Sequence, residues 1–195
     1  MNRYSVSEFL DNCWSLLLTR LTMRQARLVR RPVYLRGKKS LSGCNGLTTG
    51  RFCRFDLQGE KKTLTIGDNC EMGDMTHIVA YEKVEIGNNV LIASKCFISD
   101  ASHGSYAGDA QSVPDSIPNR RDLVTAPVKI GDKVWLGENV VVLSGVTIGS
   151  GCVIGSNSVV TKNIPENCIA VGVPARVIKQ WSADGQCWKR VHEHE

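Results

Sequence analysis

This chain of 195 residues has no closely spaced cysteine pair, no long apolar run and few aromatic side chains. Eight cysteines are present but no CxxC pair, and we expect no cleavable signal peptide, so the sequence favours a reduced, cytoplasmic protein. No apolar run approaches the roughly 20 residues that a membrane-spanning helix needs. Aromatic residues make up only 6% of the chain, whereas 18 glycines predict short strands joined by turns.

The net charge of +5 is concentrated near the N-terminus. Residues 1–39 hold nine Lys and Arg against two acidic residues, a charge of +7, so the remainder of the chain sums to −2. That remainder lacks the basic stripe with interleaved aromatic residues that is typical of nucleic-acid binding. We therefore expect no nucleic-acid partner.

A repeat of six residues dominates the second half of the sequence. From Ile130 the chain divides into IGDKVW, LGENVV, VLSGVT, IGSGCV, IGSNSV and VTKNIP. The fifth place and the next first place are two residues apart, so they point to the same side of a strand. Gly or Asn at most fourth places tolerates the left-handed backbone of a tight turn. The pattern predicts a mainly β fold, a parallel β-helix with three hexads per coil.

The hexads also run upstream, with one slip and one interruption. They restart at Ile66 and again at Ile86. Cys70, Cys96 and Cys152 fall at the inward fifth place, which favours buried packing thiols over disulfides or metal ligands. Residues 104–127 break the repeat and predict a long loop extruded directly after "ISDASH"; such loops in compact domains are often functional.

The N-terminal segment differs from the repeat. Ser5 and Glu8 fit a capping box, and apolar residues follow at roughly helical spacing: Phe9, Cys13, Trp14, Leu16, Leu17, Leu21 and Leu28. Five arginines decorate its second half: Arg20, Arg24, Arg27, Arg30 and Arg31. Two interpretations stay open: the helix packs on its own domain or a neighbouring subunit, or it rests on an anionic membrane surface. The predicted division is a helical segment 1–40, a β-helix domain 41–180 and a tail 181–195.

His103 and Trp135 occupy the sixth place of their hexads and are predicted to point outward. Residues 18 apart stack on one face, so Trp135 lies with Val153, and Val141 with Val159. Because outward apolar columns need a cover, we expect a homotrimer of parallel prisms. His103 and Trp135 would then line a cleft between subunits. In the alternative interpretation His103 only ends a coil and Trp135 only fills an interface.

Two segments resemble the hexapeptide-repeat acyltransferases, in particular the O-acetyltransferases of lipopolysaccharide and other surface polysaccharides. They are "IGNNVLIASKCFISDASHG" and "VWLGENVVVLSGVTIGSGCVIGSNSVVTKNIPENCIAVGVPARVIK". The likeness covers roughly residues 64–188. It implies a left-handed parallel β-helix with acetyl-CoA as the acyl donor, no metal, and a sugar or glycan acceptor, free or lipid-linked. The site of action would be the cytoplasm or the inner face of the cytoplasmic membrane.

The resemblance also implies roles for individual residues. His103 matches the general base, which a sugar hydroxyl needs because it is a poor nucleophile at neutral pH. Asp100 is either the orienter of that imidazole or a turn-capping residue. A backbone amide around Gly137 and Glu138 would stabilise the oxyanion. No cysteine has an adjacent base, which favours direct transfer. The residues implied for coenzyme A are Trp135, Gly137, Glu138, Ser156, Thr161, Lys162, Arg176 and Lys179.

The acceptor side follows the family less closely. Trp135, His77, Tyr81 and Arg121 are the candidate acceptor contacts, although Arg121 is equally interpreted as a solvated loop charge. Three alternative functions stay open: an N-acetyltransferase acting on an amino-sugar nucleotide, a non-catalytic assembly module, and a zinc-dependent β-helix hydratase. The hydratase needs three converging histidines, and only two lie in the repeats. His192 and His194 belong to a polar terminal "HEHE" that we expect to fray.

Overall fold

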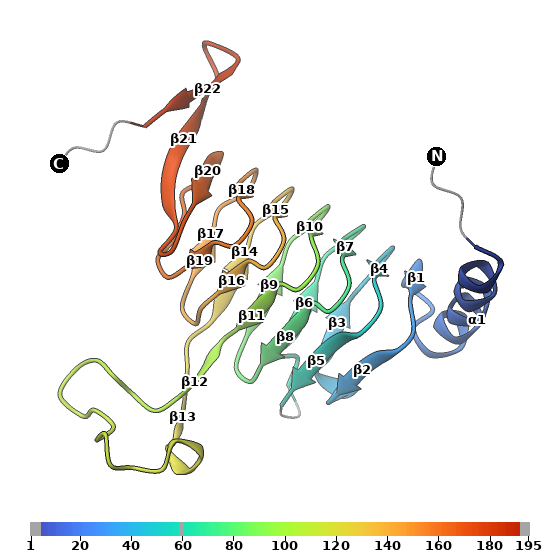
Figure 1. Cartoon of the computed structure of the whole chain (residues 1–195), viewed down its shortest axis with the longest axis horizontal. Coiled ribbons are helices and arrows are strands. Elements are labelled where there is room, and N and C mark those ends of the chain that lie inside the picture. The colour runs from blue at the N-terminus through green and yellow to red at the C-terminus, as the bar shows by residue number, and fades with distance from the viewer. Residues whose placement is uncertain (1–4, 59–60, 192–195) are drawn as a thin grey trace.

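The computed structural model describes residues 5–58 and 61–191 and shows a parallel β-helix (Figure 1). A helix lies at its N-terminal end, a β-hairpin at its C-terminal end, and one long excursion leaves its side. The predicted fold class is therefore confirmed. Among the described residues, no helix combines the length and apolar character that crossing a bilayer requires.

Three sheets form the walls of the β-helix, and within each sheet the strands follow one another in space in the order in which they are named. Sheet 1 contains β1 (Leu28–Val29), β4 (Thr48–Thr49), β7 (Glu71–Met72), β10 (Leu91–Ile92), β15 (Trp135–Leu136), β18 (Val153–Ile154), β20 (Cys168–Val171), β21 (Arg176–Ser182) and β22 (Cys187–Arg190). Sheet 2 contains β2 (Val33–Arg36), β5 (Cys53–Leu57), β8 (His77–Ala80), β11 (Phe97–Ser99), β16 (Val141–Val142) and β19 (Val159–Val160). Sheet 3 contains β3 (Leu41–Gly43), β6 (Leu64–Ile66), β9 (Val84–Ile86), β14 (Val128–Ile130) and β17 (Thr147–Ile148).

The hexads have the predicted geometry. The first-place and fifth-place residues of all six hexads from Ile130 are buried. Trp135 pairs with Val153, and Val141 with Val159, as the spacing of 18 predicts. Five fourth-place residues have left-handed backbone, with φ between 56° and 78°: Lys133, Asn139, Gly145, Gly151 and Asn157. Asn163 does not; its side-chain oxygen accepts a hydrogen bond from the Thr147 amide instead (2.8 Å).

Side chains at the corners bind the backbone of the preceding coil. The Asp68 amide donates to Asn88 Oδ1 (2.8 Å), the Asn88 amide to Asp132 Oδ1 (2.7 Å), and the Asp132 amide to Ser150 Oγ (3.1 Å). These contacts link successive coils outside the strand ladders. Backbone amides at the corners are therefore largely occupied within the fold.

The cysteines pack as predicted, with no disulfide among them. Cys70, Cys96 and Cys152 are buried in the β-helix interior. Burial raises the pKa of the Cys96 thiol to about 11 and that of Cys53 to about 11. These thiols are therefore protonated at neutral pH.

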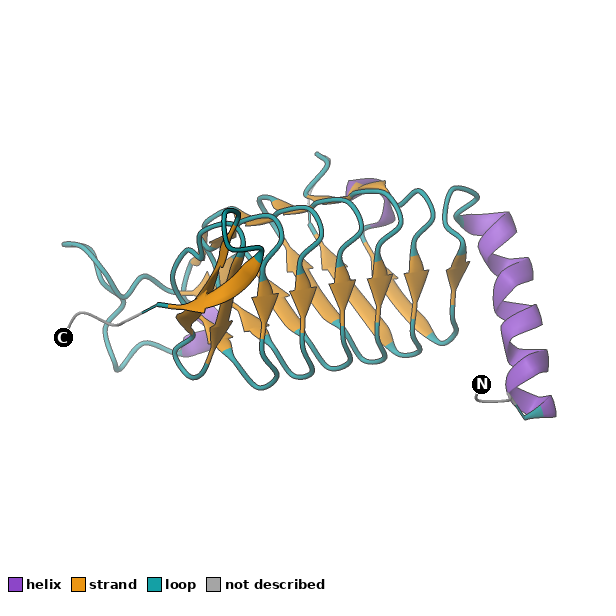
Figure 2. Cartoon of the chain, turned by 90° about the horizontal axis from the view of Figure 1, so that it is seen from above, coloured by secondary structure: helices purple, strands orange, loops and turns teal. Residues whose placement is uncertain are grey.

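Helix α1 (Val6–Thr22) begins with the predicted capping box, in which Ser5 and Glu8 bond each other reciprocally. Figure 2 shows the helix lying across the end of the β-helix. The helix is shorter than expected, because the chain turns after Met23 and Leu28 starts β1, which pairs with β4. The assignment of Leu28 to the helix is thus wrong, and the first coil begins inside the segment 1–40.

The excursion begins earlier than the predicted loop 104–127. β12 (Ala101–His103) pairs antiparallel with β13 (Leu123–Thr125), and the short 3₁₀ helix η2 (Pro118–Arg120) lies in the loop that joins them. The Ala126 amide donates to the Asp100 carbonyl (2.8 Å) and closes the base of this hairpin. His103 therefore does not occupy the sixth place of a coil; it lies on a hairpin that projects from the wall (Figure 1).

The C-terminal end is a hairpin rather than a polar tail beginning at residue 181. β20 pairs antiparallel with β21, and β21 with β22. The rings of Trp181 and Trp188 meet edge to face across β21 and β22, with centroids 5.4 Å apart. His192 and His194 lie outside the described residues. The other 3₁₀ helix, η1 (Lys38–Ser40), precedes β3 in the first coil.

Candidate active site

The side chain of His103 is exposed on the projecting hairpin. Within residues 5–58 and 61–191 no group hydrogen-bonds its imidazole, whereas its backbone is held firmly. The hydroxyl of Tyr106 donates to the His103 carbonyl (2.6 Å), and the Gly104 amide donates to the Asp122 carbonyl (2.9 Å). A fixed backbone with an unengaged imidazole is suited to accept a proton from a bound substrate.

Arg121, a predicted acceptor contact, is used inside the loop. Its Nη1 donates to the Tyr106 hydroxyl (2.6 Å), and its Nε donates to Ser116 Oγ (2.8 Å). Its Nη2 donates to the Ser116 carbonyl (2.9 Å). Since most of the guanidinium donors are satisfied by the loop, Arg121 positions Tyr106, and through it the backbone of His103. The structure thus gives Arg121 a structural role in the loop, and its contact with the acceptor stays a prediction.

Asp100, the predicted orienter of His103, lies elsewhere. Its side chain is completely buried and accepts hydrogen bonds from three successive backbone amides, those of Tyr81, Glu82 and Lys83, at 2.7 to 3.1 Å. No contact joins it to His103. In the irregular coil at the register slip, these amides have no hydrogen-bond acceptor on a neighbouring strand among the described residues. The Asp100 carboxylate is their acceptor instead. This geometry favours the alternative that the sequence left open, in which Asp100 holds a turn, over the prediction that it orients His103.

His77 lies on the outer face of sheet 2 and contacts a buried carboxylate. Its Nε2 is 3.0 Å from Asp56 Oδ2, and its ring centroid is 5.2 Å from that of Phe97. Burial favours the neutral form of Asp56, but hydrogen bonds from His77 and Arg54, together with the charges of Arg54 and Arg36, lower its pKa. His77 is thus part of a charged cluster on this wall.

The same cluster borders a shallow polar pocket. Its lining residues are Arg36, Arg54, Asp56, Leu57, Gln58 and Tyr81. Tyr81, a predicted acceptor contact, is tied through its amide to Asp100 at the base of the hairpin. The pocket and the hairpin therefore share one side of the molecule. Sequence patterns did not single out the two arginines, because these early coils pair residues 20 apart, outside the hexad period.

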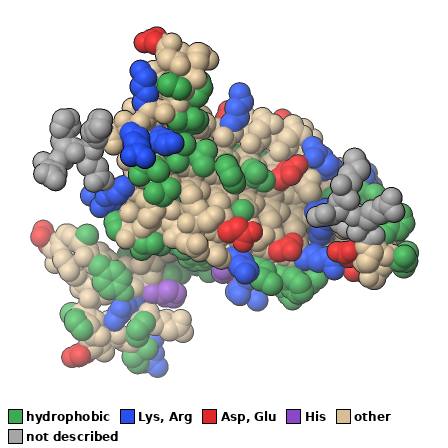
Figure 3. All heavy atoms as spheres, turned by 45° about the horizontal axis from the view of Figure 1, so that its top comes forward, with side chains coloured by type: hydrophobic (Ala, Val, Ile, Leu, Met, Phe, Trp, Pro, Cys, Tyr) green, Lys and Arg blue, Asp and Glu red, His purple; other side chains and the backbone are tan. Residues whose placement is uncertain are grey.

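Trp135 lies on a different wall from the hairpin. It is 50% exposed on sheet 1, in register with Leu91 and Val153. Figure 3 shows hydrophobic side chains gathered along this side of the molecule. In the described part of the chain no contact joins Trp135 to His103. The sequence predicted that these two side chains meet across two subunits, and that stays a prediction.

The predicted oxyanion amides are already engaged at the corner after sheet 1. The Gly137 amide donates to the Ile154 carbonyl (2.8 Å), and the Glu138 amide donates to Ser156 Oγ (3.1 Å). Neither is available to a substrate in this structure, because both join the bonding between coils. The amide of Ser156 itself has no acceptor among the described residues.

The remaining cofactor candidates lie near the C-terminal end. Lys162 and Arg176 line one groove, together with Asn163, Ile164, Ala175 and Val177. Thr161 is exposed directly before it. Lys179 lies farther along β21, where it pairs with Ile169 and Arg190, and it does not line the groove. The structure thus brings together two of the three predicted cations, a pair suited to anionic phosphates.

A metal site is not apparent in residues 5–58 and 61–191, where no three His, Cys, Asp or Glu side chains gather. Of the two repeat histidines that the zinc hydratase interpretation would use, His77 bonds Asp56 and His103 lies on the hairpin. Nothing in this geometry supports that alternative.

Comparisons with known proteins agree with this architecture. A family described as "Bacterial transferase hexapeptide (six repeats)" matches residues 127–162. The chain is also 41% identical, over 96% of each chain, to the "Putative lipopolysaccharide biosynthesis O-acetyl transferase WbbJ" of Escherichia coli K12. The chain belongs to the hexapeptide-repeat acetyltransferases. The family resemblance predicted from the sequence is confirmed.

Solved structures place this hexapeptide-repeat acetyltransferase among acyltransferase β-helices. AntD, an N-acyltransferase from Bacillus cereus, superimposes with a TM-score of 0.70 at 22% identity over 94% of each chain, which shows a shared fold. VCA0836, a hexapeptide-repeat acetyltransferase from Vibrio cholerae complexed with acetyl-CoA, has a TM-score of 0.59 at 28% identity. That match covers 73% of this chain and 72% of VCA0836.

Proposed function

We propose that this acetyltransferase transfers an acetyl group from acetyl-CoA to a sugar hydroxyl of a surface polysaccharide, such as O-antigen or capsule. The observation that carries the proposal is the unengaged imidazole of His103 on a braced hairpin. The near full-length likeness to WbbJ supports the choice of acceptor. The eight free thiols support a reducing, cytoplasmic setting.

In the proposed mechanism His103 removes the proton of the acceptor hydroxyl as the oxygen attacks the thioester carbonyl. A carbon–oxygen bond forms, and the carbon–sulfur bond then breaks. The imidazolium returns its proton to the departing sulfur, so free coenzyme A and the acetyl ester are the products.

Direct transfer is the favoured route because the interior cysteines are poor nucleophiles. Burial raises the pKa of Cys44 to about 12 and those of Cys53 and Cys96 to about 11, so their reactive thiolate forms are rare at neutral pH. The exposed Cys13 and Cys187 lie on α1 and β22, at the two ends of the molecule.

A homotrimer would complete the site. His103 and Trp135 lie on different walls, so packing one subunit's hairpin side against the next subunit's sheet 1 would bring them together. The same contact would cover Leu91 and Trp135, two large apolar side chains left exposed on sheet 1.

The groove of Lys162 and Arg176 is the proposed site for the cofactor phosphates, with Thr161 beside it. Lys179 is a more distant cation on the same end. The free Ser156 amide takes the donor role that the sequence assigned to Gly137 and Glu138, because those two amides are occupied. Trp135 would border the acyl group.

The pocket of Arg36, Arg54 and Tyr81 is the proposed acceptor subsite, with His77 at its edge. Its two guanidinium groups outnumber its one carboxylate. This favours an acceptor that carries a negative charge, either an acidic sugar or a diphosphate to which the sugar is linked.

The test is a transfer assay with purified protein, acetyl-CoA and an O-antigen or capsule precursor, read by mass spectrometry of the acetylated product. His103→Ala should lower kcat/KM on the order of 10²- to 10⁴-fold, the usual contribution of a general base. Tyr106→Phe is the matched control, because it removes the hydroxyl that holds the His103 carbonyl and leaves the imidazole intact. It should cost far less.

Two results would contradict the proposal. Equal activity of His103→Ala and the unmodified protein would exclude the base. Preferential acetylation of a nucleotide-linked amino sugar, offered in parallel, would favour N-acetyl transfer over O-acetyl transfer.

A further inference from the structure

We propose that the N-terminal end of the β-helix docks on an anionic phospholipid surface through α1. The inference rests on the packing and charge of this end and does not depend on the acetyl-transfer activity. It assigns a function to the basic N-terminal segment, which the proposed active site leaves without one.

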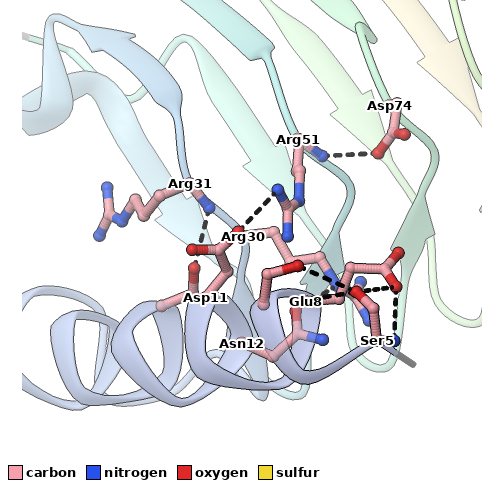
Figure 4. A network of polar contacts seen from close by, with 10 residues as sticks. Ser5, Glu8, Asp11, Asn12, Arg30, Arg31, Arg51 and Asp74 are labelled. Atoms are coloured by element: carbon pink, nitrogen blue, oxygen red, sulfur yellow. Dashed lines mark hydrogen bonds and ion pairs between the residues drawn. The ribbon is translucent and has the colours of Figure 1, made fainter.

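The face of α1 that meets the β-helix is polar. Thr19 and Ser15 are buried, and their hydroxyls accept hydrogen bonds from the amides of Val29 (2.9 Å) and Arg31 (3.1 Å) on and after β1. Asn12 Oδ1 accepts a further hydrogen bond from Arg30 Nε (3.1 Å) (Figure 4). Since β1 is the edge strand of sheet 1, these side chains pair backbone groups that would otherwise be exposed.

The opposite face of α1 is apolar and exposed. At 100° per residue, Leu10 and Leu17 lie nearly opposite Ser15 and Thr19. Six large apolar side chains on α1 are more than half exposed: Val6 78%, Phe9 59%, Leu10 61%, Trp14 58%, Leu17 52% and Leu21 67%. The apolar side of this helix therefore faces away from the protein, the reverse of a core-packed helix.

This apolar face points out of the end of the solenoid. Strands of a β-helix stack along its axis, and α1 lies against the outer edge of the first strand, where a preceding coil would be (Figures 1 and 2). Subunits packed side by side cover the walls of the prism and leave its end free. In such an assembly all the helices lie at one end and face one plane.

The net exposed charge at this end is positive, because its exposed Lys and Arg outnumber the two acidic residues of α1. The two acidic residues of α1 are engaged within the protein: Glu8 accepts from the Ser5 amide (2.8 Å), and Asp11 pairs with Arg51 (3.1 Å) (Figure 4). Arg20 and Arg24 are exposed at the C-terminal end of the helix, and η1 adds Lys38 and Lys39.

An anionic bilayer matches both features better than a second copy does. An apolar helix face flanked by cations is typical of helices that lie in the membrane interface, and clustered Lys and Arg attract anionic headgroups. A copy of the same end would bring like charges together, which opposes association. The geometry therefore points to lipid as the occupant.

The experiment is co-sedimentation of the full-length protein with vesicles of phosphatidylethanolamine and phosphatidylglycerol, compared with phosphatidylcholine alone. The unmodified protein should bind the anionic vesicles, and less so at high salt. Leu10→Glu with Leu17→Glu should abolish binding, and Arg20→Glu with Arg24→Glu should weaken it at least about tenfold. Met75→Glu, at a 51% exposed apolar side chain on the β-helix, is the matched control and should bind normally.

Circular dichroism verifies that the variants fold. If the leucine variant does not fold, a second measurement on the unmodified protein tests the proposal. It is the quenching of Trp14 fluorescence by brominated phosphatidylglycerol, with Trp14→Phe as the reference. Quenching supports the proposal, and its absence overturns it. Equal binding by the leucine variant and the Met75 variant also overturns it. A third result would also overturn the proposal. In it, the unmodified protein does not bind vesicles and forms a larger oligomer in sedimentation velocity than the leucine variant does, because a second copy would then cover the apolar face.

Discussion

Replacing Asp100 separates the structural role of this carboxylate from the catalytic one. In Asp100→Ala, the amides of Tyr81, Glu82 and Lys83 lose their shared acceptor, a completely buried carboxylate. Each buried amide left unpaired costs about 1 to 3 kcal/mol, so the free energy of unfolding should fall by about 3 kcal/mol or more. Asp100→Asn retains one oxygen acceptor and should lose less, about 1 to 2 kcal/mol.

The assay is urea unfolding at fixed protein concentration, followed by circular dichroism, alongside steady-state kinetics. The fixed concentration matters because self-association shifts apparent stability. We expect the free energy of unfolding to be highest for the native protein, lower for Asp100→Asn and lowest for Asp100→Ala. Activity under stabilising conditions should fall modestly, because the base of the hairpin loosens while the imidazole remains intact. The reasoning is refuted if Asp100→Asn leaves the unfolding free energy unchanged and lowers kcat with a shifted pH profile, the signature of an orienter of His103.

Three further predictions concern other parts of the molecule. Iodoacetamide should label Cys13 and Cys187 in the folded protein, while the six buried thiols react only after unfolding; mass spectrometry of the intact protein counts the adducts, and rapid labelling of Cys96 would contradict its raised pKa. Lys162→Ala and Arg176→Ala should each raise KM for acetyl-CoA about tenfold with little loss of stability, whereas Lys179→Ala, outside the groove, should change it less; equal effects of all three would argue against the groove. Asp56→Asn should lower stability at pH 7 and have a progressively smaller effect as the pH falls below 3.8, because a carboxylate with a lowered pKa stabilises the fold fully above its ordinary value of 3.8 and loses that contribution as the pH falls through its folded value; a thermal melting series across pH tests this, and a difference that does not shrink in acid would contradict it.

The β-helix could be predicted from the sequence because its repeat is local. Each hexad sets both the burial of its first and fifth places and the turn at its fourth, so Ile130 and Asn139 carry their own structural information. The early coils were harder, because coils whose partners lie 20 residues apart do not keep the six-residue period. Helix α1 was predictable through its capping box, but its end was not, because pairing of β1 with β4 overrides the helical spacing at Leu28.

The candidate site was less predictable because its parts depend on contacts distant in sequence. "ISDASH" fits the hexad period, yet residues 101–103 pair with 123–125, and this pairing carries His103 away from the wall. Asp100 and Arg121 were singled out for their chemistry, but both form hydrogen bonds with residues that no local sequence pattern identifies. His103 was singled out through the family resemblance, which does not depend on the hairpin, and its role as the base stays a prediction.

The stacking of sheet 2 fixes a height. From β2 to β11 there are three strand-to-strand steps, each about 4.8 Å, so the strand that leads to His103 stands roughly 14 Å above the first coil. With α1 resting on lipid, the β-helix would act as a ruler that holds the reacting hydroxyl at a set distance from the bilayer. The pocket of Arg36 and Arg54 lies lower, on β2 and β5, the first two strands of this sheet. On a glycan tethered to the membrane, the distance from the bilayer would then select which sugar is acetylated. Adding one coil would move the position of acetylation outward along the glycan.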